Sequence, residues 1–148
     1  MLKNLPSLLT PDALHALASM GHGDDVAIVD ANFPAARLAA QGGARLVELA
    51  GVDAPAALQA VLQLLPVDTF LADPVRVMEV VGDPAAVPLP VLQFKLLLAE
   101  AGEAAPTGLV RETFYAQASA AFVILRTGER RTYGNILLRK GVVSGAVT

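Results

Sequence analysis

The sequence from Met20 to Pro34 reads Met-Gly-His-Gly-Asp-Asp-Val-Ala-Ile-Val-Asp-Ala-Asn-Phe-Pro. Its apolar run, Val26 to Val29, predicts a short buried strand. His22 precedes this run between two glycines, and Asp30 follows it directly, before Pro34 prevents a central strand from continuing. In an open α/β sheet, ligands bind at the carboxyl ends of strands. The segment therefore predicts a central strand with an imidazole ahead of it and a carboxylate at its tip.

This pattern has an ordinary interpretation as well as a functional one. A histidine in a glycine-rich loop is often a surface residue, and an aspartate after a strand is often a turn residue. Histidine is also the side chain that ordinarily changes charge near neutral pH, which suits it to proton transfer. The local sequence leaves both interpretations open for His22 and Asp30.

The composition indicates a chain that folds around an apolar core. Its 148 residues, 54% of them hydrophobic, predict one domain over 1–148. A net charge of −3, from 11 Lys and Arg against 14 Asp and Glu, argues against nucleic acid as a partner. No apolar run reaches the ~18 residues of a membrane helix and the N-terminus lacks a signal-peptide core, so we expect a cytoplasmic protein with no membrane partner. The absence of cysteine excludes disulfides, and the two histidines argue against a histidine-rich metal site.

Helical and strand patterns alternate along the chain, with no element assigned to 35–43. This alternation predicts an α/β fold with a mostly parallel sheet flanked by helices, in three α/β/α layers. In the helix expected over 88–102, the predicted core residues are Leu92, Leu96 and Ala99. A turn over 127–129 predicts antiparallel pairing near the C-terminus, with a hairpin as the simplest form. The predicted helices cover 11–20, 53–65, 88–102 and 114–121, and the predicted strands cover 26–29, 45–49, 75–81, 107–110, 122–125 and 135–138.

Three further polar groups stand out at expected element ends. Arg111 and Tyr115 lie at a strand-to-helix junction, Asp68 follows a helix end at Pro66, and Tyr133-Gly134-Asn135 precedes the last strand. Each has an ordinary alternative as a solvated, half-buried or turn residue. The chain has no glycine-rich phosphate loop and no nucleophile elbow. Together the carboxylates, amide, arginine and aromatic rings suit a small polyhydroxylated ligand.

Five segments, in this order, resemble the ribose pyranase and fucose mutarotase family. The resemblance extends from about Leu2 to Val143, and the last segment is the most specific. The Arg111 segment and Tyr-Gly-Asn are closer to the fucose branch, whereas the chain has Asn32 where members often carry His. The segments are Met20-Gly-His-Gly-Asp24, Asp30-Ala-Asn-Phe-Pro34, Leu65-Pro-Val-Asp-Thr-Phe70, Arg111-Glu-Thr-Phe-Tyr115 and Thr127-Gly-Glu-Arg-Arg-Thr-Tyr-Gly-Asn-Ile-Leu-Leu-Arg-Lys-Gly-Val142.

The resemblance implies an isomerase that interconverts sugar anomers without cofactor or metal. It further implies a cytoplasmic homo-oligomer, often a ring-built decamer, with its sites near subunit contacts. His22 corresponds to the catalytic proton donor. The residues that correspond to the sugar site are Asp30, Arg111, Tyr133, Gly134 and Asn135, with Asp68 and Tyr115 as further positions implicated in some members.

The predicted chemistry fits this set of residues. Mutarotation delivers a proton to the ring oxygen and removes one from the anomeric hydroxyl, and His22 is the best-placed general acid or base. A strand over 25–29 at ~3.3 Å per residue places His22 and Asp30 roughly 15–20 Å apart. We therefore hypothesise that each site combines His22 of one subunit with Asp30 of another.

Other functions remain open at this point. Ribose or another pentose is an alternative substrate for the same chemistry. A non-catalytic sugar-binding transport accessory is a second alternative, and it would need Asp30, Arg111 and Asn135 but not His22. A nucleotide-binding module is disfavoured because the chain lacks a phosphate loop.

Overall fold

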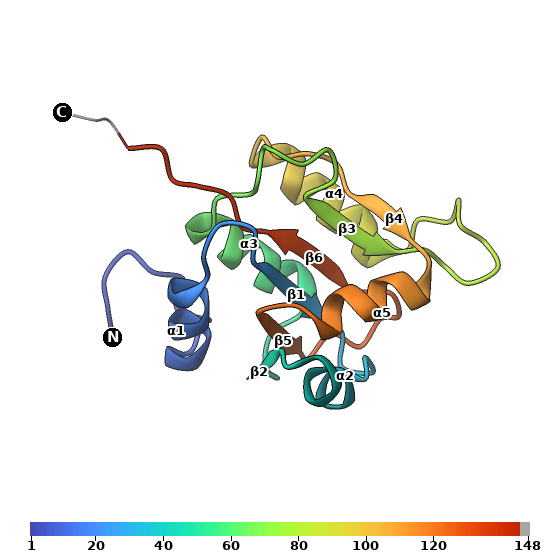
Figure 1. Cartoon of the computed structure of the whole chain (residues 1–148), viewed down its shortest axis with the longest axis horizontal. Coiled ribbons are helices and arrows are strands. Elements are labelled where there is room, and N and C mark those ends of the chain that lie inside the picture. The colour runs from blue at the N-terminus through green and yellow to red at the C-terminus, as the bar shows by residue number, and fades with distance from the viewer. Residues whose placement is uncertain (146–148) are drawn as a thin grey trace.

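The computed structural model describes residues 1–145, in which helices and strands alternate as predicted (Figure 1). The predicted domain extends to residue 148, and 146–148 lie outside the described residues. The helices are α1 (Pro11–Ser19), α2 (Ala35–Gly42), α3 (Ala54–Leu64), α4 (Leu89–Glu100) and α5 (Arg111–Ser119). The strands are β1 (Asp25–Val29), β2 (Arg45–Leu49), β3 (Val75–Met78), β4 (Thr107–Leu109), β5 (Val123–Thr127) and β6 (Ile136–Arg139).

The strands form one sheet in the order β2-β5-β1-β6-β3-β4. β5 runs parallel to both β1 and β2, and β3 runs parallel to β4, which confirms the mostly parallel sheet. Only β6, among the strands of residues 1–145, is antiparallel to its neighbours, β1 and β3. This confirms the predicted antiparallel pairing near the C-terminus. The hairpin form is wrong, because β1 lies between β5 and β6 and the loop between these two strands passes over the end of β1.

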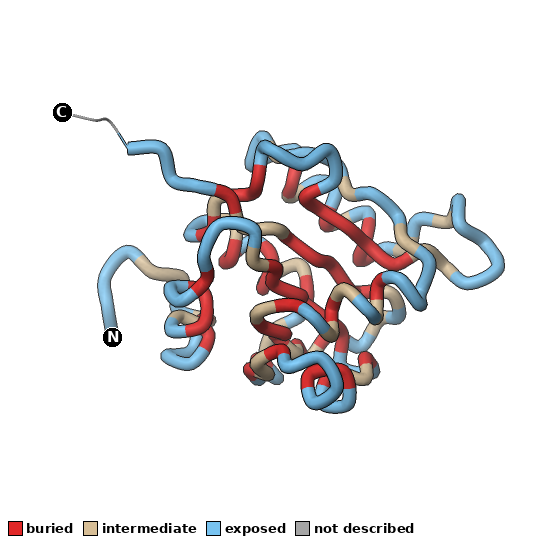
Figure 2. Tube along the Cα trace, viewed as in Figure 1, coloured by how far each residue is buried: buried red, intermediate tan, exposed pale blue. Residues whose placement is uncertain are grey.

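Helices cover both faces of the sheet and confirm the three-layer arrangement. Val26 and Ile28 of β1 pack with α1, α3 and α4, whereas Ala27 and Val29 pack with α2 and α5. All five residues of β1 are buried, and Figure 2 shows burial concentrated along the central strands. Because both faces of β1 are covered, its sequence is a continuous apolar run rather than an alternating one.

Two helical regions differ from the prediction. Residues 35–43, to which no element was assigned, contain α2, which follows Pro34 without a side-chain cap and ends at Gly43. In α4 the predicted core face is wrong, since Leu92 and Leu96 are exposed and Phe94 and Leu98 are buried. α4 carries apolar residues around its whole circumference, so helical periodicity does not select a buried face.

A buried ion cluster fixes the start of β1. The Asp25 carboxylate accepts hydrogen bonds from Arg76 Nη2 at 2.9 Å and from Arg139 Nε at 3.0 Å. Arg76 lies on β3 and Arg139 on β6, so the cluster ties three strands together. Burial alone raises the pKa of Asp25, but the hydrogen bonds and charges of the two arginines outweigh it and leave the pKa below its ordinary value.

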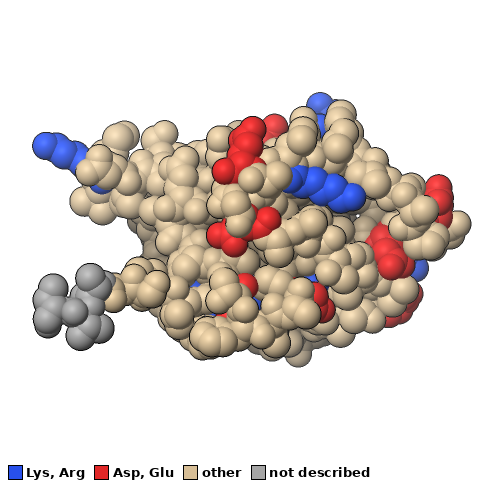
Figure 3. Space-filling model, turned by 90° about the horizontal axis from the view of Figure 1, so that it is seen from above, with Lys and Arg blue, Asp and Glu red and all other residues tan. Residues whose placement is uncertain are grey.

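The surface carries charges of both signs. On the face shown in Figure 3, most side chains are uncharged, and basic and acidic residues occur in small separate groups rather than in one basic patch. In residues 1–145 no helix has the length and hydropathy needed to cross a membrane.

Candidate functional site

A cavity of about 220 Å³ lies at the carboxyl end of β1. This is smaller than the roughly 300–1,000 Å³ that drug-sized ligands occupy, so it suits a small ligand. Polar and aromatic side chains line it together with one methionine: Asp30, Asn32, Phe33, Met78, Arg111, Tyr115, Thr132, Tyr133 and Asn135. Five of the predicted sugar-site residues are therefore brought together here, from β1, α5 and the loop before β6.

Asp30 and Asn135 form a reciprocal pair on the floor of the cavity. The Asp30 amide donates to Asn135 Oδ1 at 2.9 Å, and Asn135 Nδ2 donates to Asp30 Oδ2 at 3.1 Å. The Asn32 amide donates to Asp30 Oδ1 at 3.0 Å. Burial raises the pKa of Asp30 above its ordinary value even though these hydrogen bonds oppose the shift. The pair presents fixed carboxylate and amide groups to a hydroxylated ligand.

Tyr133 and Gly134 shape the wall next to this pair. Tyr133 has a φ of 63°, which is uncommon for a bulky residue, and its hydroxyl accepts a hydrogen bond from the Val81 amide at 3.1 Å. At Gly134 a Cβ atom would lie 2.7 Å from Glu129 Cγ and 3.6 Å from Asp30 Cβ. Gly134, predicted as a sugar-site residue, therefore allows a close approach of the loop to the Glu129 side chain, and it does not itself line the cavity.

Glu129 braces the same loop and was not predicted. Its carboxylate accepts hydrogen bonds from Arg131 Nε at 2.9 Å and from the Ala54 amide at the start of α3 at 3.3 Å. The Arg131 hydrogen bonds outweigh desolvation and lower the pKa of Glu129 to about 2. Sequence pattern gave no signal for this role, because a glutamate before two arginines is typical of a solvated turn.

Arg111 and Tyr115 enter the cavity from α5. Arg111 is the first residue of α5, as the predicted strand-to-helix junction requires, and its side chain is half exposed. Tyr115 packs edge-to-face on Phe33, with ring centroids 5.2 Å apart. Met78, Thr132 and Phe33 also line the cavity but were not predicted, since nothing in their local sequence distinguishes them from core or turn residues.

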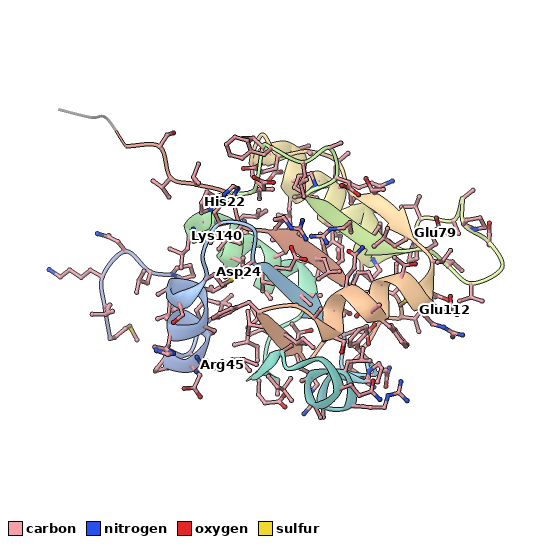
Figure 4. The ribbon with its side chains drawn as sticks, viewed as in Figure 1. His22, Asp24, Arg45, Glu79, Glu112 and Lys140 are labelled. Atoms are coloured by element: carbon pink, nitrogen blue, oxygen red, sulfur yellow. The ribbon has the colours of Figure 1, made fainter. Side chains whose placement is uncertain are left out.

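His22 and Asp68 form a second group at the opposite end of β1. His22 Nε2 lies 3.1 Å from Asp68 Oδ1, and Asp68 is buried. Gly23 has a φ of 88°, and its amide donates to the Lys140 carbonyl at 2.9 Å, which fixes the loop that carries His22. Figure 4 shows His22 beside Lys140 and Asp24, away from Glu112, which follows Arg111 in the chain. The structure thus does not bring His22 or Asp68 into the cavity of its own chain.

The environment of Asp68 favours its charged form. Desolvation raises its pKa, but hydrogen bonds from His22 and from the amides of Phe70 and Leu71 outweigh this and leave the pKa below the ordinary value. Because Asp68 accepts the hydrogen on Nε2, the neutral His22 ring carries its lone pair on Nδ1.

Larger hollows elsewhere in the described residues lack the same combination of features. A cavity of about 580 Å³ lies at the amino end of β1, and its acidic Asp25 is already bound by two arginines. In residues 1–145 no group of three His, Cys, Asp or Glu side chains is arranged to hold a metal ion. Within residues 1–145, the cavity of Asp30 and Asn135 combines a carboxylate with a raised pKa, a tyrosine with a positive φ and the half-exposed side chain of Arg111.

The fold is a three-layer α/β domain with a small cavity, lined by polar and aromatic side chains, at the carboxyl end of a central strand. Residues 3–143 match the RbsD / FucU transport protein family, and the chain belongs to this family. The fucose mutarotase of Bos taurus is 42% identical over 147 residues, covering 97% of this chain and 95% of the relative. These matches confirm the resemblance predicted from the five sequence segments.

Solved structures agree with this assignment. A fucose mutarotase from Streptococcus pneumoniae, in complex with L-fucose, superimposes with a TM-score of 0.89 at 35% identity, covering 97% of this chain and all 100% of that chain. Bacillus subtilis RbsD complexed with D-ribose superimposes with a TM-score of 0.75 at 21% identity, covering 97% of this chain and 100% of that chain. The second likeness concerns the fold alone.

Proposed function

We propose that this protein is a sugar mutarotase that interconverts the α and β anomers of L-fucose by general acid/base catalysis. The observation that carries the proposal is the paired Asp30 and Asn135 in a small cavity, together with a His22–Asp68 pair outside it. Fucose mutarotases that share 42% identity over nearly the whole chain support L-fucose as the substrate. Ribose or another sugar is the alternative substrate.

The cavity residues have distinct roles in binding. The Asp30 carboxylate accepts hydrogen bonds from sugar hydroxyls, and the Asn135 amide donates to a neighbouring sugar oxygen. Arg111 donates a hydrogen bond to a further sugar oxygen. Tyr115 and Tyr133 cover the apolar C–H face of the sugar. Gly134 lets the loop that carries Tyr133 and Asn135 pack closely against Glu129.

His22 moves the protons. One proton leaves the anomeric hydroxyl and one reaches the ring oxygen, so the bond between C1 and the ring oxygen breaks and an open aldehyde forms. Rotation about the C1–C2 bond and the reverse proton transfers close the ring with the opposite configuration. Asp68 is a positioning residue, because it fixes the tautomer and orientation of His22 and touches no sugar. General acid/base catalysis of this kind contributes on the order of 10²–10⁴ in rate.

The site combines two subunits in this proposal. His22 precedes β1 and Asp30 follows it, so one monosaccharide does not reach both within one chain. A contact that joins two different surfaces of one subunit is heterologous, and such contacts generate a ring when the rotation between copies closes. We therefore propose a ring-built homo-oligomer, with a decamer as the expected size, and a cytoplasmic location.

Exchange spectroscopy on the anomeric protons of L-fucose and of D-ribose tests the proposal. We expect faster exchange on L-fucose, and a loss on the order of 10²–10⁴ with His22→Ala. Faster exchange on ribose alone would keep the chemistry and change the substrate. Binding without faster exchange would instead indicate the sugar-binding accessory.

A mixing experiment tests the shared site. His22→Ala and Asp30→Ala subunits are each expected to be inactive in a ring of their own kind. Subunits unfolded and reassembled together in equal amounts should regain about a quarter of the sites, because one contact in four joins an intact His22 to an intact Asp30. Mixed rings with no regained activity would contradict the shared site, provided that mass spectrometry detects both variants in one assembly.

A further inference from the structure

Phe70 is an exposed aromatic residue held beside His22. Its side chain is 71% exposed, and its ring centroid lies 5.2 Å from that of His22 at an interplanar angle of 54°. Its neighbour Leu71 is 42% exposed. Both lie on the segment that follows the isolated bridge between Val67 and Lys140.

One buried carboxylate fixes both rings. The Asp68 carboxylate accepts hydrogen bonds from the Phe70 amide at 3.3 Å and from the Leu71 amide at 3.2 Å. The same carboxylate also contacts His22 Nε2. The backbone of Phe70 is therefore not free to turn its ring into the core. A large apolar side chain fixed in an exposed position beside a second exposed apolar residue indicates a protein or ligand contact surface.

A hollow beside the sugar cavity, which shares Arg111 with it, presents a second apolar surface. Val81, whose amide donates a hydrogen bond to the Tyr133 hydroxyl, is 57% exposed, and Val110, which precedes Arg111, is 53% exposed. Phe70 and this second surface lie at opposite ends of the sheet within one subunit. They are different surfaces, so joining them between copies gives the heterologous contact that a shared site requires.

We propose that Phe70 enters the sugar cavity of a neighbouring copy together with His22 and contacts the methyl group of a 6-deoxy sugar. The inference rests on the proposed function and deepens it by assigning a specificity residue. The reacting ring oxygen is bonded to C1 and to C5, and in L-fucose C5 carries the methyl group. A ring centred 5.2 Å from the imidazole that serves this oxygen is therefore within reach of the C5 substituent.

Sugars that differ only at C5 test this contact. D-arabinopyranose has the ring configuration of L-fucose but no methyl group, and L-galactose carries a hydroxymethyl group there. For Phe70→Ala we expect the ratio of kcat/KM for L-fucose over D-arabinose to fall about fourfold to tenfold, as loss of one methyl contact predicts. The ratio for L-galactose over D-arabinose should change less, because a hydroxymethyl group is solvated when the aromatic wall is absent.

The ratio separates specificity from assembly and folding. Each ratio is measured on one protein sample, so a smaller fraction of assembled sites lowers both rates equally and cancels. Leu71→Ala is the matched control and should leave the ratio unchanged, since only its backbone amide binds Asp68. An unchanged ratio in Phe70→Ala, with or without a loss of rate, would overturn the proposal. Wild-type protein that accelerates exchange of none of these sugars would instead refute the proposed function.

Discussion

Replacing Asp25 with Ala should destabilise the protein severely. The Asp25 carboxylate accepts hydrogen bonds at 2.9–3.2 Å from Arg76 and Arg139, and the Arg76 side chain is only 4% exposed. The substitution leaves a buried guanidinium without its counter-ion. Removal of one partner from a buried pair costs about 3–5 kcal/mol, and we expect this loss in the free energy of unfolding. For a chain of this size such a loss lowers Tm by roughly 10–16 °C.

Urea denaturation at one fixed protein concentration measures this effect, because assembly makes stability depend on concentration. The matched control is Glu48→Ala, which removes an ion pair in which the Glu48 side chain is 52% exposed and the Arg126 side chain 33% exposed. Exposed pairs contribute about 0–1 kcal/mol, so the control should remain close to wild type. Equal losses for Asp25→Ala and Glu48→Ala would refute the reasoning that burial determines the cost.

Three further predictions concern the site. Because the pKa of Glu129 is lowered from 4.5 to about 2, its ionised carboxylate stabilises the fold above pH 4.5, and this stability is lost as the pH falls toward 2. Measurements of the free energy of unfolding across this pH range should show a loss of up to about 3 kcal/mol that Glu129→Gln lacks. An equal loss in the variant would contradict this assignment. Gly134→Ala should raise KM about tenfold, because the added Cβ would lie 2.7 Å from Glu129 Cγ and displace the loop. In the control variant Gly51→Ala the added Cβ meets no atom within 4 Å, so KM should not change. Equal KM values for the two variants would refute the close-approach argument. Because burial raises the pKa of Asp30, sugar binding followed by NMR titration should weaken with falling pH before an ordinary aspartate protonates, and Asp30→Asn should remove this dependence.

The sequence predicted the order and type of most elements because their local signals agree with their tertiary environment. The apolar run of β1 matches a strand buried on both faces, and Thr10 and Asp53 accept hydrogen bonds at the starts of α1 and α3. The capping signal is absent where the prediction missed a helix. α2 follows Pro34 with no side-chain cap, and two of the three residues on its buried face, Ala35, Leu38 and Ala39, are alanines.

Which strands pair, and which face of a helix is buried, were harder to predict than whether a segment is a helix or a strand. A turn at 127–129 followed by an apolar run is compatible with a hairpin, yet β1, from a distant part of the chain, takes the place next to β6. In α4 an apolar circumference hides which face is buried. Both errors concern choices that long-range packing makes, since the local sequence is equally compatible with each outcome.

For the site, sequence resemblance identified the polar residues that meet in the cavity but not the groups that hold them. Glu129 supports the loop of Tyr133 through hydrogen bonds that join it to Arg131 and to the start of α3. Residues from two distant segments meet there, so no spacing along the chain predicts the contact. The separation of His22 from Asp30 was predictable, because a buried strand between them has a fixed rise per residue.

The two halves of the proposed site are each prepared within one subunit. A buried carboxylate, Asp68, orients His22 and the Phe70 backbone, and a reciprocal amide–carboxylate pair fixes Asp30. Neither half needs its partner in order to form its hydrogen bonds, so assembly only has to bring two finished surfaces together. Catalysis by such a site pays little conformational entropy when subunits meet, because the reacting groups are already ordered. In the proposed arrangement, β1 separates His22 from Asp30 within one chain, so activity belongs to the assembled ring rather than to the single chain.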